Sequence, residues 1–351
     1  MRTRTMSSAR IRLMPVLVLS ALATGAFAQS KVGTTAGQFL GISVGPRAIA
    51  MGSAYTASND DATLLYWNPG AFVQANKSEF VFANTQWLVG TKFRWFGFML
   101  SLDGDNAFGA SLTQLDYGEE EVTSVAYPEG TGERWSAKDL AFAISYCRRL
   151  TDKFSIGGSA KYITQQIWNE SASAFTFDVG LLFVTDFNGM RLGMSMSNFG
   201  SDLKLDGNDL LERVDIDPAN SGSNKTLVGS LKTDSWPTPL LFRVGVAMDV
   251  VKEDDFKATV AVDALRPSDN AESVNVGAEI SWRNMLFLRG GYKSLFGKES
   301  PFNRETQQEG LSAGAGLRYA VEGIASLEVN YAFQKFGLFG NLNTISLAIG
   351  F

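Results

Sequence analysis

The sequence has no histidine and a single cysteine, Cys147, among its 351 residues. Without histidine, Ser-His-Asp and Cys-His catalysis are excluded and the commonest metal ligand is missing. One cysteine can form neither an internal disulfide nor a zinc site. The glycine-rich stretches lack the Lys-Ser/Thr of a phosphate-binding loop. We therefore expect no enzymatic activity, no metal and no cofactor.

Beyond the first 28 residues the sequence also lacks a run of eighteen apolar residues, so no membrane-spanning helix is predicted. Residues 1–28 are predicted to be a signal peptide, with an arginine-rich start, an apolar stretch at 13–22 and the cleavage site Ala26-Phe27-Ala28. The remaining 323 residues hold 27 basic and 36 acidic side chains, a net charge of −9. An acidic exported chain is a poor binder of nucleic acid.

The mature chain alternates apolar residues with small or polar ones. From Thr344 to Phe351, Ile, Leu, Ile and Phe alternate with Thr, Ser, Ala and Gly. Alternate side chains of a strand point to opposite faces, so one face is apolar and the other small or polar. About fourteen such segments occur, most of them near the ten residues that a tilted membrane strand needs. They lie near residues 79–89, 92–102, 106–116, 138–149, 154–168, 174–185, 190–199, 237–250, 256–265, 272–283, 285–295, 310–319, 325–335 and 342–351.

The connections between these segments alternate in length. Every second one is short, such as Asp103–Asp105, whereas the others include residues 117–137, 200–236 and 296–309. Short turns at one end and long loops at the other are typical of outer-membrane barrels with both termini in the periplasm. A soluble β-sandwich shows the same alternation of side chains but has no reason to alternate its loop lengths. We predict an all-β fold, an antiparallel transmembrane β-barrel of about fourteen strands formed by residues 79–351, in the cell outer membrane.

The charged residues of the predicted strands fall on the small or polar face, which we expect to line the lumen. A lysine or arginine facing lipid at the membrane midplane would cost about 2–4 kcal/mol. The alternative is that they face solvent on an ordinary soluble sheet. These residues are Asp178, Arg243, Asp249, Asp263, Arg289, Lys293, Arg318 and Glu328.

The stretch Gly33–Phe72 is rich in glycine and lacks strand alternation. Because wall side chains alone cannot fill a barrel of about fourteen strands, we predict that residues 29–78 form a plug. Its apolar residues disfavour the alternative, a disordered periplasmic tail. The predicted plug residues are Arg47, Gly52, Asp60, Asp61, Trp67, Asn68 and Pro69, and the lumen charges available to pair with the plug are Arg243, Asp249, Arg289 and Arg318.

Two features of the sequence have alternative interpretations. Asp60 and Asp61 could act as an acid–base pair, but a turn or a helix cap is the favoured role. The tryptophans could line a hydrophobic pocket, but they are more often belt residues at the membrane interfaces. The tryptophans concerned are Trp67, Trp87, Trp95 and Trp236.

The ordered set of residues between Gly33 and Pro69 resembles the N-terminal segment of the PorV/PorQ family, which is distantly related to the FadL fatty-acid channels. The matching residues are Gly33-Thr34, Ala36, Gln38-Phe39-Leu40, Val44-Gly45, Arg47-Ala48, Met51-Gly52, Ala54, Asp60-Asp61-Ala62 and Trp67-Asn68-Pro69. The resemblance implies a plug folded into the periplasmic side of a barrel. The aromatic C-terminal residue, Phe351, is similar to the terminal signature by which outer-membrane barrels are recognised for assembly.

Proteins that resemble PorV act in type IX secretion, where they bind exported cargo at the outer membrane and associate with the translocon barrel. The resemblance therefore implies a non-enzymatic protein whose partners are outer-membrane lipid, the translocon and cargo, with residues 117–137 and 200–236 as the candidate docking surface. The alternative is a FadL-like passive channel for a hydrophobic ligand. Such a channel needs an apolar pocket and a lateral opening, whereas the predicted lumen face is mostly small or charged.

Overall fold

The computed structural model describes residues 32–351 except 218, 221–226, 296–309 and 322–324. The predicted signal peptide, residues 1–28, lies outside the described residues, as do residues 29–31 of the predicted plug and the whole predicted loop 296–309. No helix in the described part of the chain is long and apolar enough to cross a membrane.

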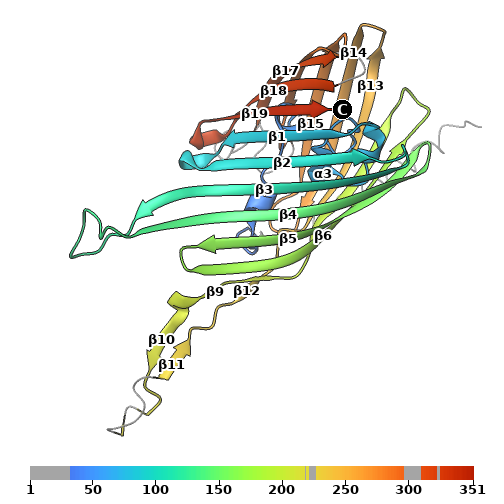
Figure 1. The fold of residues 1–351 in the computed structure, drawn as a ribbon. Helices are drawn as coiled ribbons and strands as arrows, with labels where there is room; N and C mark the ends of the chain where they lie inside the picture. Colours follow the sequence, from blue (N-terminus) through green and yellow to red (C-terminus); the bar gives the residue numbers. More distant parts are fainter. Residues whose placement is uncertain (1–31, 218, 221–226, 296–309, 322–324) are drawn as a thin grey trace, which may run out of the picture. The chain divides into compact units, whose positions relative to one another are not determined.

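Fourteen long antiparallel strands form one closed barrel in the described residues (Figure 1). Each strand pairs with its neighbour in the sequence, and β1 pairs with β19 to close the ring. This confirms the predicted fold and strand number. The strands are β1 (Glu79–Gln86), β2 (Lys92–Ser101), β3 (Asn106–Glu121), β4 (Arg134–Thr151), β5 (Phe154–Ile167), β6 (Glu170–Val184), β7 (Arg191–Gly200), β13 (Leu241–Lys252), β14 (Phe256–Pro267), β15 (Ser273–Trp282), β16 (Leu286–Tyr292), β17 (Leu311–Val321), β18 (Ala325–Lys335) and β19 (Asn341–Gly350).

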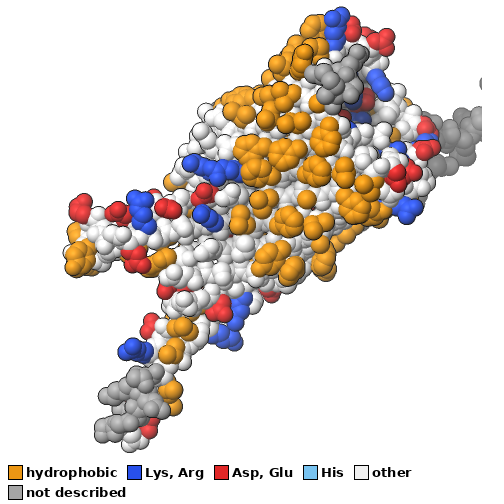
Figure 2. All heavy atoms as spheres, in the orientation of Figure 1, with side chains coloured by type: hydrophobic (Ala, Val, Ile, Leu, Met, Phe, Trp, Pro, Cys, Tyr) orange, Lys and Arg blue, Asp and Glu red, His pale blue; other side chains and the backbone are white. Residues whose placement is uncertain are grey.

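The barrel is apolar outside and polar inside. In β19 the side chains of Ile345 and Leu347 are exposed, whereas those of Thr344 and Ser346, which alternate with them, are buried. In the other strands apolar side chains likewise spread over the outer surface, as Figure 2 shows for one face. A soluble protein would bury these side chains, so the outer surface is built to face lipid.

The two ends of the barrel differ, as predicted. Connections at one end, such as residues 102–105 and 152–153, are short, and the C-terminus lies at this end. At the other end two hairpins project from the barrel (Figure 1). By the pattern of outer-membrane barrels, the short-turn end faces the periplasm and the long-loop end faces the exterior.

The projecting hairpins correct two predicted loops. After a register shift between Asp116 and Glu119, the ladder of β3 and β4 continues to the pair Glu121 and Arg134, and residues 117–137 form an arm. Residues 200–236 contain a separate hairpin of β10 (Leu211–Val214) and β11 (Leu227–Ser230). Shorter elements in this region are β8 (Leu203–Lys204), β9 (Asp206–Gly207), η4 (Asn208–Leu210) and β12 (Ser235–Trp236).

The segment before β1 fills the lumen with four short helices. Its residues from Val44 to Ala57 are almost all fully buried, and α2 packs against β16, β17, β18 and β19. A disordered tail is therefore the wrong alternative for this segment. The helices are η1 (Gln38–Gly41), α2 (Pro46–Ala50), α3 (Leu64–Trp67) and η2 (Phe72–Ala75), and two further turns, η3 (Leu88–Gly90) and η5 (Gly337–Phe339), lie between barrel strands.

The family resemblance had implied a plug at the periplasmic side of the barrel, but the segment extends well beyond that side. Its first described residues lie at the long-loop end, where Ala36 N–H donates to the Pro237 carbonyl (2.9 Å) and Thr35 Oγ1 donates to Asp269 Oδ2 (2.6 Å). It reaches the short-turn end near Glu79, whose carboxylate accepts from Ala62 N–H (2.7 Å). The segment therefore runs along the length of the lumen.

Candidate functional site

The contact between the plug backbone and the barrel wall depends on glycines from both sides. At Gly52, with φ +63°, a Cβ would lie 2.6 Å from the backbone nitrogen of Tyr292, and at Gly277 it would lie 2.2 Å from the carbonyl oxygen of Met51. Only glycine adopts such a φ freely and leaves room for so close an approach. Gly52 is one of the predicted plug residues, and its backbone lies directly against the wall. The matching glycine of the wall, on β15, was not predicted.

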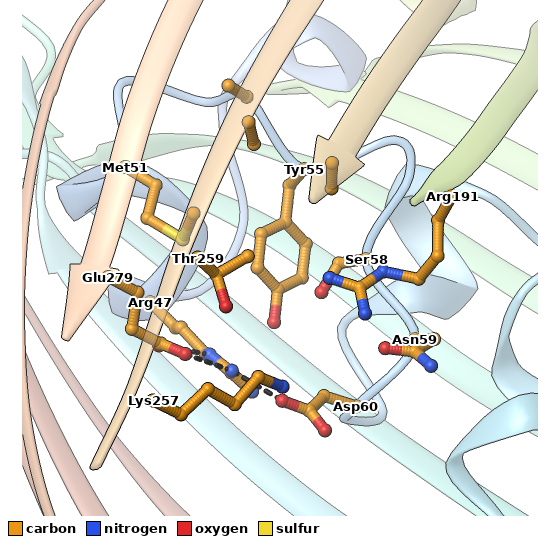
Figure 3. A pocket seen from close by; sticks show the side chains of 13 residues that line it. Arg47, Met51, Tyr55, Ser58, Asn59, Asp60, Arg191, Lys257, Thr259 and Glu279 are labelled. Carbon is orange, nitrogen blue, oxygen red and sulfur yellow. Dashed lines mark hydrogen bonds and ion pairs between the residues drawn. The ribbon is translucent and has the colours of Figure 1, made fainter. Parts of the chain in front are cut away.

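Arg47 on α2 is the main ionic link between the plug and the wall. Its guanidinium is buried and donates to both carboxylate oxygens of Glu279 on β15, at 2.6 and 2.7 Å. Within the plug it also pairs with Asp60 at 2.5 Å (Figure 3). The guanidinium lies 3.5 Å from Asp61. The Arg47 guanidinium lowers the pKa of Asp60, whose side chain is 40% exposed. The plug is therefore fixed to the wall by a buried, charge-assisted contact.

The ion pairs continue from Glu279 along the wall. Arg289 on β16 donates to Glu279 at 2.6 Å and lies 3.7 Å from Glu328 on β18, which in turn pairs with Arg318 at 2.7 Å. The guanidiniums of Arg289 and Arg318 each lie 5.0 Å from the ring centre of Phe287. Charges of alternating sign can share a low-dielectric interior only when they are paired in this way.

The sequence prediction had the wrong partners for most of these charges. Asp60 and Asp61 pair with Arg47 of the plug itself, not with Arg243, Arg289 or Arg318 of the wall. Asp249 pairs with Arg191 (3.1 Å) and Lys257 (3.4 Å), both of which belong to the wall.

Arg243 contacts aromatic rings instead of a plug carboxylate. Its guanidinium lies 5.3 Å from the ring centre of Tyr66 and 5.2 Å from that of Trp67. The Trp67 indole donates to the Val44 carbonyl (2.9 Å). Trp67 and Trp95 are both buried in the lumen, so neither is an interfacial belt residue.

The end of α3 fits closely against β6. The Asn68 amide donates to the carbonyls of Thr56 (2.8 Å) and Leu181 (2.9 Å), tying two parts of the plug to the wall. After Pro69, the chain passes so near the wall that a Cβ on Gly70 would lie 2.2 Å from the Gly180 carbonyl oxygen. The Asn68-Pro69-Gly70 turn is thus shaped by the wall.

Asp61 and Asp263 order the plug backbone. Asp61 accepts from the backbone N–H of Thr63 (2.8 Å) and from the Tyr55 hydroxyl, which supports the turn role over acid–base chemistry. Asp263 on β14 accepts from the backbone N–H groups of Tyr55 and Thr56, both at 2.8 Å. The strand alternation had placed Asp263 in the lumen, but nothing in the sequence indicated its partners.

The plug leaves little free space. Two lumen cavities have volumes of about 20 Å³ each, one beside Arg47 and Lys257 and the other beside Leu65 and Trp95. Each has room for about one water molecule, whereas pockets for small organic ligands measure roughly 300–1,000 Å³. No group of three potential metal ligands occurs among the residues that the structure describes.

A closed barrel with an apolar outer band, a polar lumen and an internal N-terminal plug defines an outer-membrane protein. The sequence model of the type IX secretion system protein PorV matches residues 26–217, more than half of the chain. The chain therefore belongs to the PorV family, as its N-terminal segment had indicated. No curated protein matches it.

Solved structures with the same fold include the CymD monoaromatic hydrocarbon channel, with a TM-score of 0.55 and 14% identity over 88% of this chain and 96% of that one. The toluene transporter TodX of Pseudomonas putida has a TM-score of 0.53 and 14% identity over 88% and 97%. TbuX of Ralstonia pickettii, also a toluene transporter, has a TM-score of 0.50 and 11% identity over 88% and 97%. At this identity the likeness establishes the FadL-like fold and not the function.

Proposed function

We propose that this chain is a non-enzymatic docking protein of type IX secretion that binds cargo or translocon partners at the cell surface through its two projecting hairpins. The observation that carries the proposal is that the plug fills the lumen, while the two hairpins at the long-loop end expose surfaces suited to binding a partner. Membership of the PorV family supports the secretion role. The signal peptide, residues 1–28, would direct the chain to export and be cleaved.

The β10–β11 hairpin has the properties of a docking surface. Leu211, Val214, Leu227 and Val228 are all exposed, although they belong to a sheet of only two four-residue strands. A two-stranded hairpin is marginally stable in water by itself, and exposed apolar clusters mark interaction sites. A partner that covers these side chains would stabilise the hairpin.

The β3–β4 arm offers a different surface. Residues 117–137 carry five glutamates and one arginine, a net charge of −4, together with exposed Tyr117, Val125 and Tyr127. Such a surface favours a basic partner and speeds its association. We infer that the arm steers a partner and that the apolar hairpin holds it.

Serine substitutions test this proposal without deleting a loop. In cells, Leu211→Ser combined with Val228→Ser should reduce cargo release or attachment. The barrel itself should still assemble, so the protein should still migrate faster on a gel unboiled than boiled. The matched control is Leu338→Ser combined with Phe339→Ser, since these exposed residues lie in η5 at the same end. Normal secretion in the hairpin variant would refute its role.

The second candidate function is a FadL-like channel, favoured by the fold of the hydrocarbon channels described above. The cavity lined by Leu40, Leu65, Tyr66 and Trp95 is the only apolar-lined one of the two described. At about 20 Å³ it is too small for a hydrocarbon unless the plug moves. Mass spectrometry of lipids and proteins that co-purify from outer membranes distinguishes the two functions, because a stoichiometric hydrophobic ligand would favour the channel.

A further inference from the structure

Three basic side chains form a cluster on the outer surface of the barrel at the long-loop end. They are Lys92 and Arg94 on β2 and Lys138 on β4. Their strand neighbours, such as Phe93 and Asp139, are buried in the lumen, so the three basic side chains point outward. In the sheet register, Lys92 and Lys138 both lie opposite Asp116 of β3, which brings the cluster together across three adjacent strands.

The cluster carries more positive charge than its surroundings neutralise. Arg94 lies 3.8 Å from Asp116, but Lys92 and Lys138 have no ion-pair partner in the described part of the chain. The next outward acid along β3, Glu119, lies beside Arg134 at 3.7 Å. Figure 2 shows basic side chains next to the broad apolar surface of β2–β6. Lys92, Arg94, Lys138 and Asp116 together therefore carry a net charge of +2, on a chain that is negative overall.

The height of the cluster can be derived from β4. Lys138 and Arg148 both point outward and bracket the outward apolar residues from Leu140 to Tyr146. Ten residues at about 3.3 Å each, tilted by about 40°, span roughly 25 Å, which is the height of the apolar band of an outer-membrane barrel. Lys138 and its neighbours therefore lie at the level of lipid headgroups, on the exterior side of the membrane.

We propose that Lys92, Arg94 and Lys138 bind the phosphate of a phosphorylated lipid headgroup in the outer leaflet. Ammonium and guanidinium groups form charge-assisted hydrogen bonds to phosphate, and their long side chains extend to the headgroup level. The acyl chains would pack on Phe96 and Phe142 directly below. The proposal rests on the membrane location alone and is independent of the secretion role.

Lipid binding to the purified protein tests the proposal. The protein in non-ionic detergent is titrated with bis-phosphorylated lipid A and with its phosphate-free counterpart, and complexes are counted by native mass spectrometry. The triple variant Lys92→Gln, Arg94→Gln, Lys138→Gln should bind the phosphorylated lipid at least about tenfold more weakly, because each cation contributes to attraction of an anionic surface. High salt should weaken wild-type binding.

The matched control removes the same charge at the opposite end, with Arg148→Gln, Lys153→Gln and Lys252→Gln, and should bind like the wild type. A second triple variant, Lys92→Arg, Arg94→Lys, Lys138→Arg, keeps the charge and should retain binding, so a folding defect of the glutamine variant is recognised. Equal affinity of the wild type for the two lipids would overturn the proposal. Undiminished binding by a folded glutamine variant would overturn it as well.

Discussion

Replacing Glu279 by glutamine should release the plug from the wall while leaving the barrel closed. The Glu279 carboxylate is buried and accepts hydrogen bonds from Arg47 and Arg289. Glutamine keeps the shape but removes the negative charge, so two buried guanidiniums lose their shared counter-ion. Removing one partner of a buried pair costs about 3–5 kcal/mol. Because Asp60 still faces Arg47 and Glu328 still faces Arg289, we expect the lower end, about 3 kcal/mol, or roughly 150-fold in the equilibrium between docked and released plug.

Hydrogen exchange measured by mass spectrometry is the direct assay. Amides between Val44 and Trp67 should exchange roughly 150-fold faster in Glu279→Gln if release limits their exchange, whereas the barrel strands should keep their protection. The matched control is Glu272→Gln, since the Arg266–Glu272 pair is exposed (side chains 77% and 71%). It should change stability by less than about 1 kcal/mol. Identical exchange in wild type, Glu279→Gln and the control would refute the proposed role of the Arg47–Glu279 contact.

Four further outcomes are expected. Deleting residues 33–72 should leave a barrel that inserts but conducts ions in planar bilayers, while the intact protein is nearly silent; equal conductance would show that the segment does not block the lumen. Gly52→Ala should weaken plug docking by more than about 2 kcal/mol, because a Cβ would meet backbone atoms at a positive φ, and unchanged hydrogen exchange would contradict this. Arg47 lowers the pKa of Asp60, so the ion pair stabilises the docked plug at pH values above the ordinary carboxyl pKa of about 4. This stabilisation is lost as the pH falls below about 4. The conductance of the wild type should therefore rise on acidification, and that of Asp60→Asn should rise less. Removing Phe351 should reduce assembled, heat-modifiable barrel in outer membranes, and full assembly would argue against a terminal recognition signal.

Much of the barrel was determined by local sequence pattern. Alternation with a period of two fixes which side chains face lipid and which face the lumen, so the strand at Thr344–Phe351 could be assigned from eight residues. The lengths of the connections then gave the orientation of the ends. Where strands extend beyond the membrane this signal ends, and residues 117–137 form an arm although they lack an apolar face.

The tertiary structure alone decided how the lumen is filled. Arg47 and Glu279 are separated by 232 residues, and their contact depends on the order and register of the strands around the closed ring, which no local pattern encodes. The same is true of Gly277 on the wall. A side chain is excluded there only because the plug backbone at Met51 lies against it. The sequence by itself thus determined which face of most strands is polar and which segment enters the barrel, but it did not single out Glu279, the buried partner of Arg47. Closure of the barrel determined which charges meet and how far along the lumen the segment runs, because both depend on contacts between residues distant in the chain.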